Sequence, residues 1–536
     1  MLISCTGVAF SYPDRSIPLF TNLTITLSDD ARLGVIGANG SGKSTLLRLF
    51  AGELQPTAGT ITKRTPAPSM RLVSLDPGDS RTVIESALAA IDPRLAATHA
   101  LLQSQGKDAA AAAAEFASLD GYAVLACVQR TLTQARLGEP TWKQATEVLS
   151  VGERLWLRIT EALLASCDLL LLDEPTSHLD IRWRADLAAM LQDLDTPYAV
   201  VSHDRHFLDL VCTQVLQLQR GTARLFAGGY SASRATLAAE EEHDRDVYTQ
   251  QTRKVKQLTR AMGTVKSHAA MIEAKAYRTS SGFFSHKAAK MERRAAALRG
   301  QLQRSLAEAK TAQPFVEKQR HYALPSSECA GVLVSLVRVS VPVGTSILFR
   351  HLSMTVRAGE HWCILGPNGA GKSTLVDVLS GKRAPTSGEV VLSPSVRIAV
   401  APQQAALACG DSLPIDLVCQ AGSCSQQDAR ILLGTLGLGD NFIVQPMRLL
   451  SAGQQKRVLI ATLVAERPGL LVIDELEGGL DLDALMAMQQ ALATFRGALV
   501  MVTHDAVLAQ SIGGHFITLD GTGGWSMDSP FDQPAP

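Results

Sequence analysis

The sequence lacks the cysteine spacing of a disulfide framework or a zinc site. Its nine cysteines are scattered singly along 536 residues, with no CxxC pair. An odd number of dispersed cysteines favours reduced thiols, which are typical of the cytoplasm. We therefore expect a cytoplasmic protein without structural disulfides or bound zinc.

Long apolar runs are also missing. No uncharged apolar stretch reaches the roughly 18 to 20 residues that a membrane-spanning helix needs, and no signal-peptide pattern opens the chain. We expect no transmembrane domain in this chain.

Neither sign of charge is in excess. Lys and Arg total 51, Asp and Glu total 51, and the formal net charge is zero. Aromatic residues make up only 5% of the chain, whereas 46% is hydrophobic, as in ordinary core-forming proteins. Any affinity for nucleic acid must then come from local clusters of Lys and Arg. The length predicts two or three domains.

What the sequence does contain is one motif twice, GANGSGKST and GPNGAGKST. Each follows a short β-branched segment and opens a helical pattern, which is the context of a phosphate-binding loop. The glycines allow a turn that points backbone N–H groups at phosphates, while the lysine contacts them and the serine reaches Mg²⁺. The predicted nucleotide ligands are Gly37, Asn39, Gly40, Gly42, Lys43, Ser44, Thr45, Gly366, Asn368, Gly369, Gly371, Lys372, Ser373 and Thr374, with Ser44 and Ser373 also on Mg²⁺.

Each loop is followed by an apolar run that ends in Asp-Glu, LLLLDE in the first half and LLVIDE in the second. Such a run predicts a buried parallel strand that delivers carboxylates at its C-terminal end, where ligands bind in α/β sheets. We expect Asp173 and Asp474 to hold Mg²⁺. Glu174 and Glu475 are suited to act as general bases on the attacking water.

A histidine follows a further β-rich segment in each half, at His203 and His504. A lone histidine is more often structural than functional. The repetition in both halves favours a contact with the γ-phosphate.

LSVGER at residues 149–154 and LSAGQQKR at residues 450–457 lie between the phosphate loop and the Asp-Glu run. They resemble the signature motifs of ATP-binding cassette proteins. The resemblance implies an α/β fold with two P-loop ATPase domains in tandem, which form a head-to-tail sandwich around two ATP molecules. It also implies that the nucleotide held by one cassette is contacted by signature residues of the other, namely Ser150, Gly152, Glu153, Ser451, Gly453 and Gln454.

The two predicted ATP sites differ. Gln403 stands where the family places a Mg²⁺-contacting glutamine, whereas the first cassette offers Pro77. Tyr12 stands where the family stacks an aromatic ring on adenine, whereas the second cassette has Val341 there. We therefore expect ATP to bind, and to turn over, unequally at the two sites.

The segment between the two cassettes is basic. Residues 253–310 hold fourteen Lys or Arg against three Glu, a net charge of +11, after an acidic patch at residues 240–246. Good helix formers dominate, and a turn is expected at residues 279–282. We predict a hairpin of two antiparallel helices, each of about 30 residues and about 45 Å. Its tip would carry Tyr277, Arg278, Phe283, Phe284 and Lys287.

A solvated basic hairpin is the simplest interpretation of this segment. Aromatic residues at an exposed tip, together with many Lys and Arg, favour RNA recognition instead. Membrane-surface binding is disfavoured because the helices lack a broad apolar face.

Tandem cassettes around a basic helical hairpin, without a transmembrane domain, resemble the ABC-F family of ribosome-associated ATPases. The expected domains are a first cassette at residues 1–232, the hairpin linker at 233–325 and a second cassette at 326–536. The resemblance implies a monomer whose cassettes pair with each other, with ATP and Mg²⁺ as cofactors. It further implies binding at the E site of the 70S ribosome, with the linker directed at P-site tRNA and at 23S rRNA of the peptidyl transferase centre.

A long linker with only a modest arm before the first signature motif resembles the antibiotic-resistance branch, which protects the ribosome. A housekeeping translation factor of the same family is the first alternative. The ATPase subunit of a drug exporter is a second one, although such subunits need no basic hairpin. DNA-repair ATPases usually carry zinc cysteines or very long coiled coils, and neither is present.

Overall fold

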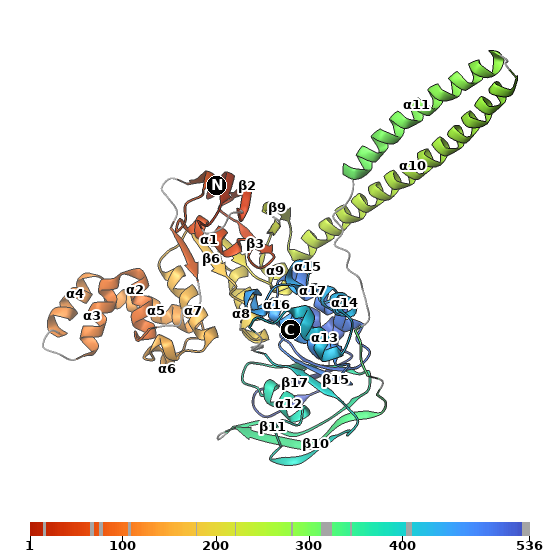
Figure 1. Cartoon of the computed structure of the whole chain (residues 1–536). Helices are drawn as coiled ribbons and strands as arrows, with labels where there is room; N and C mark the ends of the chain where they lie inside the picture. Colours follow the sequence, from red (N-terminus) through yellow and green to blue (C-terminus); the bar gives the residue numbers. More distant parts are fainter. Residues whose placement is uncertain are drawn as a thin grey trace. The chain divides into compact units, whose positions relative to one another are not determined.

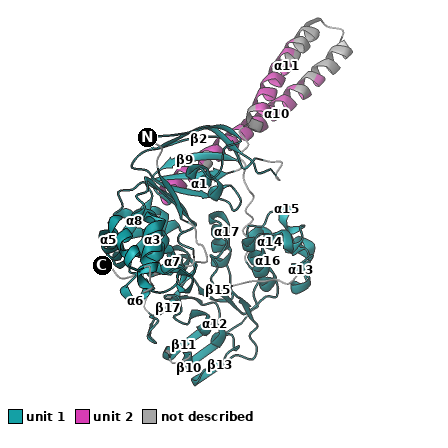
Figure 2. Ribbon diagram, turned by 90° about the vertical axis from the view of Figure 1, so that its left-hand side faces the viewer, with its two compact units in different colours: residues 1–230, 319–536 teal, residues 231–318 magenta. Residues whose placement is uncertain are grey.

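The computed structural model describes residues 1–13, 18–64, 69–73, 79–104, 109–177, 179–219, 221–279, 282–311, 324–327, 329–343, 346–403 and 410–527. The chain divides into two compact units (Figure 2). The first combines Met1–Tyr230 with Gln319–Pro536, and the second is Ser231–Lys318.

The first unit contains two six-stranded sheets of the same plan. In each, five strands pair in parallel and a sixth lies antiparallel at one edge. The first sheet has the order β5 (Met70–Val73), β6 (Leu169–Asp173), β7 (Tyr198–Val201), β3 (Arg32–Gly37), β8 (Gln214–Gln219), β9 (Thr222–Ala227). The second has β14 (Ile398–Ala401), β15 (Leu470–Asp474), β16 (Ala498–Val502), β12 (His361–Leu365), β17 (His515–Leu519), β18 (Trp525–Ser526).

A three-stranded antiparallel sheet accompanies each large sheet. In the first half it is β2 (Phe20–Leu27), β1 (Ile3–Phe10), β4 (Ala58–Lys63), and in the second β11 (Ser346–Arg357), β10 (Val332–Val343), β13 (Ser387–Leu392). The matching sheets confirm the prediction of two α/β domains in tandem. Within them, the leucines of β6 are fully buried, because helices cover both faces of a parallel sheet.

The helices of the two halves also correspond (Figure 1). One follows the first parallel strand: α1 (Lys43–Ala51) or α12 (Lys372–Leu379). A helical group precedes the Asp-Glu strand: α2 (Val83–Ile91), α3 (Pro93–Gln103), α4 (Ala109–Ser118), α5 (Gly121–Gln134), α6 (Glu139–Trp142), η1 (Thr146–Val148) and α7 (Val151–Leu164), against α13 (Pro414–Gly422), α14 (Gln426–Thr435), α15 (Asp440–Ile443), η2 (Met447–Leu449) and α16 (Ala452–Ala465). Two more follow it: α8 (Ile181–Gln192) and α9 (Arg205–Val211), against α17 (Leu482–Ala493) and α18 (Ala506–Ile512).

The second unit consists of two long helices that run side by side in Figures 1 and 2, α10 (Tyr230–Thr279) and α11 (Gly282–Thr311). The predicted length of about 30 residues agrees with the 30 residues of α11 but is wrong for α10, which has 50. The acidic patch is rich in Ala and Glu, both good helix formers, and α10 therefore continues through it. The predicted tip side chains of Tyr277, Arg278, Phe283, Phe284 and Lys287 lie outside the described part of the structure.

Within the described residues, no single helix has the length and apolar composition to cross a membrane. The pair α4 and α5 meets both criteria when taken together, but its two helices are bent by 78° at their junction.

Candidate functional site

Both phosphate-loop motifs fold as a strand, a loop and a helix. β3 ends at Gly37 and α1 begins at Lys43, while β12 and Lys372 repeat the arrangement in the second cassette. The N-cap glycines, Gly42 and Gly371, have φ values of 100° and 96°. This left-handed region is costly for residues with a side chain, so the turn into each helix requires glycine.

The two loop lysines are buried and point back at their own loops. Lys43 Nζ donates to the carbonyl oxygens of Gly37 at 2.9 Å and Ala38 at 3.3 Å. Lys372 Nζ donates to Gly366 at 3.0 Å and Pro367 at 2.9 Å. Burial lowers the pKa of both ammonium groups, and nearby carboxylates oppose the shift. Each loop thus holds a cation above the backbone N–H groups that would meet phosphates.

Asp173 and Asp474 stand at the C-terminal ends of β6 and β15, as predicted. In both, Oδ1 is buried without a hydrogen-bond partner among the described residues. Burial raises the pKa of Asp474, and a hydrogen bond from the Ser373 hydroxyl opposes the shift. Burying a carboxylate oxygen without a hydrogen-bond partner costs free energy unless a ligand binds to that oxygen. The serine and aspartate of this pair therefore fit the oxygen ligands that Mg²⁺ takes.

A cavity of about 290 Å³ opens over the first phosphate loop. Tyr12 lines it beside the loop, and its hydroxyl lies 3.2 Å from Thr45 Oγ1. The structure thus brings together the predicted adenine, phosphate and metal ligands of the first cassette. The described lining consists of Tyr12, Leu19, Asn39, Gly40, Gly42, Lys43, Ser44, Thr45, Asp173, Glu174 and Val201. Leu19 and Val201 were not anticipated from the sequence.

The two candidate general bases share an unusual backbone. Glu174 and Glu475 have φ values of 51° and 52°, in the left-handed region. Each backbone N–H donates to the neighbouring strand, to the carbonyl oxygen of Val201 at 2.9 Å and of Val502 at 3.0 Å. Strained backbone of this kind is retained where the surrounding structure holds it and is common at functional sites. Its repetition in both cassettes aims the two carboxylates in the same way.

In the first site, the Glu174 carboxylate has the Ser177 side chain and His203 as described partners. His203 Nε2 is 3.1 Å from Glu174 Oε1. Burial raises the pKa of Glu174 to about 7, although the charge of Lys43 opposes the shift. Burial, together with Lys43, lowers the pKa of His203 to about 4, so this imidazole is neutral near pH 7.

In the second site, the carboxylate has two described side-chain partners. Gln403 Nε2 donates to Glu475 Oε2 at 2.6 Å, and His504 Nε2 lies 3.6 Å from Oε1. The His504 imidazole first, and then Gln403, hold the pKa of Glu475 below its ordinary value. Gln403 was predicted on Mg²⁺ and here lies on the adjacent carboxylate. Pro77, its counterpart in the first cassette, lies outside the described residues.

The predicted signature residues form the N-termini of α7 and α16. Ser150 and Ser451 cap these helices, with Glu153 and Gln454 completing reciprocal capping boxes. Gly453 packs so closely that a Cβ would overlap the carbonyl oxygen of Gly479, whereas one at Gly152 would meet the Leu179 side chain at 3.3 Å. The described lining of the first cavity belongs to the first cassette, so contact between signature and opposite nucleotide stays a prediction.

The two cassettes do face each other across their phosphate loops. Asn39 N donates to Asp481 Oδ2 at 3.0 Å, and Asn368 N donates to Asp180 Oδ2 at 3.1 Å. Both aspartates also cap helices, α8 and α17, through the other carboxylate oxygen. The sequence interpretation missed Asp180 and Asp481 as contact residues, although both close the repeated Asp-Glu motif at matching positions.

Comparison with known families gives an ABC transporter match at residues 20–177 and 349–477, together more than half of the chain. The probable ATP-binding protein YbiT of Escherichia coli O157:H7 is 28% identical, covering 93% of this chain and 92% of its own length. The probable ATP-binding protein YheS of E. coli K12 is 29% identical, and the match covers 92% of this chain and 75% of YheS. ABC transporter F family member 5 of Arabidopsis thaliana is 26% identical, and the match covers 94% of this chain and 73% of that protein. The chain is homologous to these proteins.

Solved structures share the fold. The archaeal ribosome recycling factor aABCE1, in complex with the ribosomal stalk protein aP1, superposes with a TM-score of 0.63. It is 17% identical, and the match covers 97% of this chain and 89% of that one. An RNase-L inhibitor structure gives the same values.

Proposed function

Because the chain belongs to the ABC transporter family, with two cassettes in one polypeptide, we propose that it is an ATP-hydrolysing ribosome-binding protein of the ABC-F type. One observation carries the ATPase part. Each cassette holds a phosphate-loop lysine, an Asp-Glu pair at a strand end and a histidine near the glutamate. That set positions a nucleotide, a metal and an attacking water.

The proposed roles follow from this geometry. The phosphate loops bind the triphosphates, Ser44 with Asp173 and Ser373 with Asp474 hold Mg²⁺, and Gln403 adds to the second metal site. When bound, Mg²⁺ neutralises charge on the β- and γ-phosphate oxygens. Glu174 and Glu475 orient the water and accept its proton, while His203 and His504 contact the γ-phosphate.

Closure of the cassettes would complete both sites. Ser150, Gly152 and Glu153 would contact the nucleotide of the second cassette, and Ser451, Gly453 and Gln454 that of the first. The contacts of Asn39 with Asp481 and of Asn368 with Asp180 support this arrangement, because they hold each phosphate loop against the opposite cassette. One polypeptide keeps the halves at high effective concentration, which favours a monomer with an internal cassette dimer.

The two-helix unit is the proposed RNA-binding element. Between residues 253 and 304, its described side chains include exposed basic residues on both helices, whereas the side chains of Glu273 and Glu292 lie outside the described part. Exposed cations of this density suit a phosphate backbone. The basic side chains are Arg253, Lys254, Lys256, Arg260, Lys290, Arg293, Arg294, Arg299 and Arg304.

The ribosome is the proposed partner because of the relatives. One homologue is named an F family member, and the fold is shared with a protein described as a ribosome recycling factor and, in another structure, as ribosome-bound. We place the ATP-bound protein at the E site of the 70S ribosome in the cytoplasm, with the linker directed at 23S rRNA and P-site tRNA. Protection against ribosome-targeting antibiotics is the proposed outcome, and a housekeeping role in translation is the alternative.

Sedimentation through a sucrose cushion tests ribosome binding. The Glu174→Gln, Glu475→Gln variant should pellet with 70S ribosomes in ATP and remain in the supernatant in ADP, because ATP closes the cassettes and hydrolysis is blocked. Recovery only with membranes would instead support the exporter alternative.

Drug susceptibility distinguishes the proposed antibiotic-resistance role from the housekeeping role in translation. A sensitive host that expresses the wild-type protein should tolerate a macrolide, lincosamide or streptogramin drug better than one that expresses the double variant. Unchanged susceptibility with intact ribosome binding would favour the housekeeping role. Replacing Phe283 and Phe284 by alanine should spare basal ATPase and reduce protection, if these residues form the working tip.

A further inference from the structure

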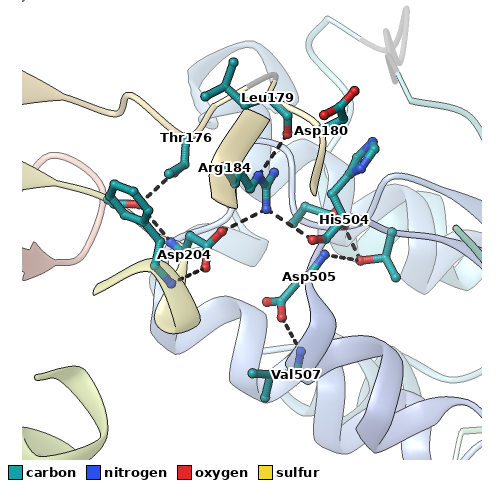
Figure 3. A network of polar contacts seen from close by, with 12 residues as sticks. Thr176, Leu179, Asp180, Arg184, Asp204, His504, Asp505 and Val507 are labelled. Atoms are coloured by element: carbon teal, nitrogen blue, oxygen red, sulfur yellow. Dashed lines mark hydrogen bonds and ion pairs between the residues drawn. The ribbon is translucent and has the colours of Figure 1, made fainter. Parts of the chain in front are cut away.

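Arg184 of α8 lies one helical turn after Asp180. Its Nε donates to the carbonyl oxygen of Leu179 at 2.9 Å, which fixes the guanidinium at the start of its own helix. Its Nη1 donates to Asp204 Oδ2 at 3.0 Å and to the carbonyl oxygen of His504 at 3.3 Å (Figure 3). The side chains of Arg184 and Asp204 are only 15% and 14% exposed, so water screens this pair little.

The two acceptors of Nη1 belong to different ATP sites. Asp204 directly follows His203, the histidine of the first site, and caps α9 by accepting from Phe207 N at 2.9 Å. His504 is the histidine of the second site. The helices that follow these two loops, α9 and α18, also contact each other. One guanidinium therefore joins the loops of both histidines across the cassette interface.

Further polar contacts extend this link to the loop that follows Glu174 and to Glu475. On one side, Thr176 follows Glu174 closely in sequence, and its Oγ1 lies 2.7 Å from Ser202 Oγ. Ser202 Oγ in turn accepts from Asp204 N at 3.0 Å. On the other side, His504 Nε2 lies 3.6 Å from Glu475 Oε1. The loop after one general base thus connects through Arg184 to the other base.

The second cassette has no equivalent of this arginine. When the Asp-Glu motifs are aligned, Arg184 corresponds to Leu485, which is 2% exposed within the core. Asp505, the equivalent of Asp204, is used to cap α18 and accepts from Val507 N and Leu508 N. A cassette therefore folds with leucine at this position and an aspartate in the loop. The fold does not require an arginine here, so Arg184 is suited to a role between the sites.

We propose that Arg184 is a positioning residue that couples the two ATP sites, an inference that rests on the proposed binding of ATP at both. Binding at the first site fixes the loop of His203 and Asp204. Through Arg184, this fixes the backbone at His504 and prepares the second site. Because coupling is reciprocal, occupancy of the second site strengthens binding at the first by the same factor.

Calorimetric titration with a non-hydrolysable ATP analogue measures this coupling. In the wild type, binding of the first analogue molecule should lower the dissociation constant of the second by about fivefold or more, within the range typical of allosteric coupling. Arg184→Leu, which copies the second cassette, should bring that factor close to one. The affinity of each site alone, measured with Lys43→Ala or Lys372→Ala present, should stay unchanged.

Two further variants separate coupling from a general loss of structure. Arg182→Leu removes an exposed arginine from the same helix and should leave the coupling intact. Arg184→Lys retains a cation between Asp204 and His504 and should restore part of it. If Arg184→Leu fails to fold, Arg184→Gln, which keeps a neutral donor, should show the same loss of coupling.

Hydrogen exchange gives a readout that is independent of affinity. With Lys372→Ala present, the analogue occupies only the first site. Its binding should slow amide exchange in residues 498–512 of the second cassette, and Arg184→Leu should abolish that protection. Coupling that survives Arg184→Leu, or that disappears equally in Arg182→Leu, would overturn the inference. Failure of the wild type to bind the analogue would instead refute the proposed function.

Discussion

The two cassettes share one backbone plan but surround their candidate general bases differently. Both have a lysine folded onto its phosphate loop, a glutamate at positive φ and a serine-capped signature helix. Glu174 has Ser177 and His203 as described side-chain partners, whereas Glu475 has Gln403 and His504. Duplication has therefore kept the frame that aims each carboxylate, while the groups that set its protonation have diverged.

A second difference lies beneath the sites. In the second cassette, Glu477 accepts from the Thr503 hydroxyl and from His504 N, and Lys456 donates to the carbonyl oxygen of Glu475. The aligned positions in the first cassette carry Thr176 and Leu155. Charged side chains thus support the second site, whereas hydroxyl contacts support the first. A buried charged contact of this kind is weak evidence for added stability.

Removing both glutamates tests what the two sites share. Glu174→Gln with Glu475→Gln should lower steady-state ATPase by about 100-fold or more, the usual contribution of a general base. ATP binding, followed by calorimetry, should persist because the phosphate loops are intact. Hydrolysis at the wild-type rate would show that neither carboxylate acts as the base.

Tyr12→Ala tests the difference in adenine contact. With site two disabled by Lys372→Ala, it should weaken ATP binding at site one by about 1–3 kcal/mol, the typical value of one base stacked on an aromatic ring. Tyr12→Phe keeps the ring, loses the contact with Thr45 and should bind nearly as well. An unchanged dissociation constant in Tyr12→Ala would show that Tyr12 does not stack on adenine.

The signature glycines provide a matched pair for stability. Gly453→Ala should destabilise the protein by about 1–3 kcal/mol, because the new methyl group meets the rigid carbonyl of Gly479. Gly152→Ala should cost less, since the Leu179 side chain can move aside. Urea unfolding of the two variants measures the difference, and equal losses would show that the closer packing in the second cassette has no energetic consequence.

Gln403→Ala should have the smallest effect. It removes one hydrogen bond to Glu475, worth about 1 kcal/mol net. In a Glu174→Gln background, where only site two can hydrolyse ATP, turnover should fall about fivefold, which is that energy expressed as a rate. No change would mean that Gln403 supports neither the carboxylate nor the metal.

Much of the frame could be predicted from the sequence because it depends on local rules. The glycine loops and the apolar run of β6 are each specified by a few adjacent residues. Repetition in two halves then made chance matches improbable. The 50-residue length of α10 was underestimated, because α10 begins before the acidic patch and continues through it, and the residues of the patch favour a helix.

The contacts between the cassettes could not be predicted in the same way. Asn39 and Asp481 are far apart in sequence, and their hydrogen bond depends on how two folded domains meet. Arg184 carries no motif at all, since its neighbours in sequence do not reveal that a carbonyl of the other cassette lies beside it. The one indication in the sequence is that the aligned position of the second cassette carries Leu485 instead of an arginine.

If each bound ATP is held by both cassettes, ATP must draw the first phosphate loop toward the signature helix of the second cassette. Spin labels at two exposed positions, Arg48 on α1 and Leu449 before the second signature helix, report the distance between the first phosphate loop and the opposite signature. In the double glutamate variant, with Cys127→Ser to remove an exposed thiol, this distance should shorten with ATP and not with ADP. The same distance in ATP and in ADP would show that ATP is not held between the two cassettes.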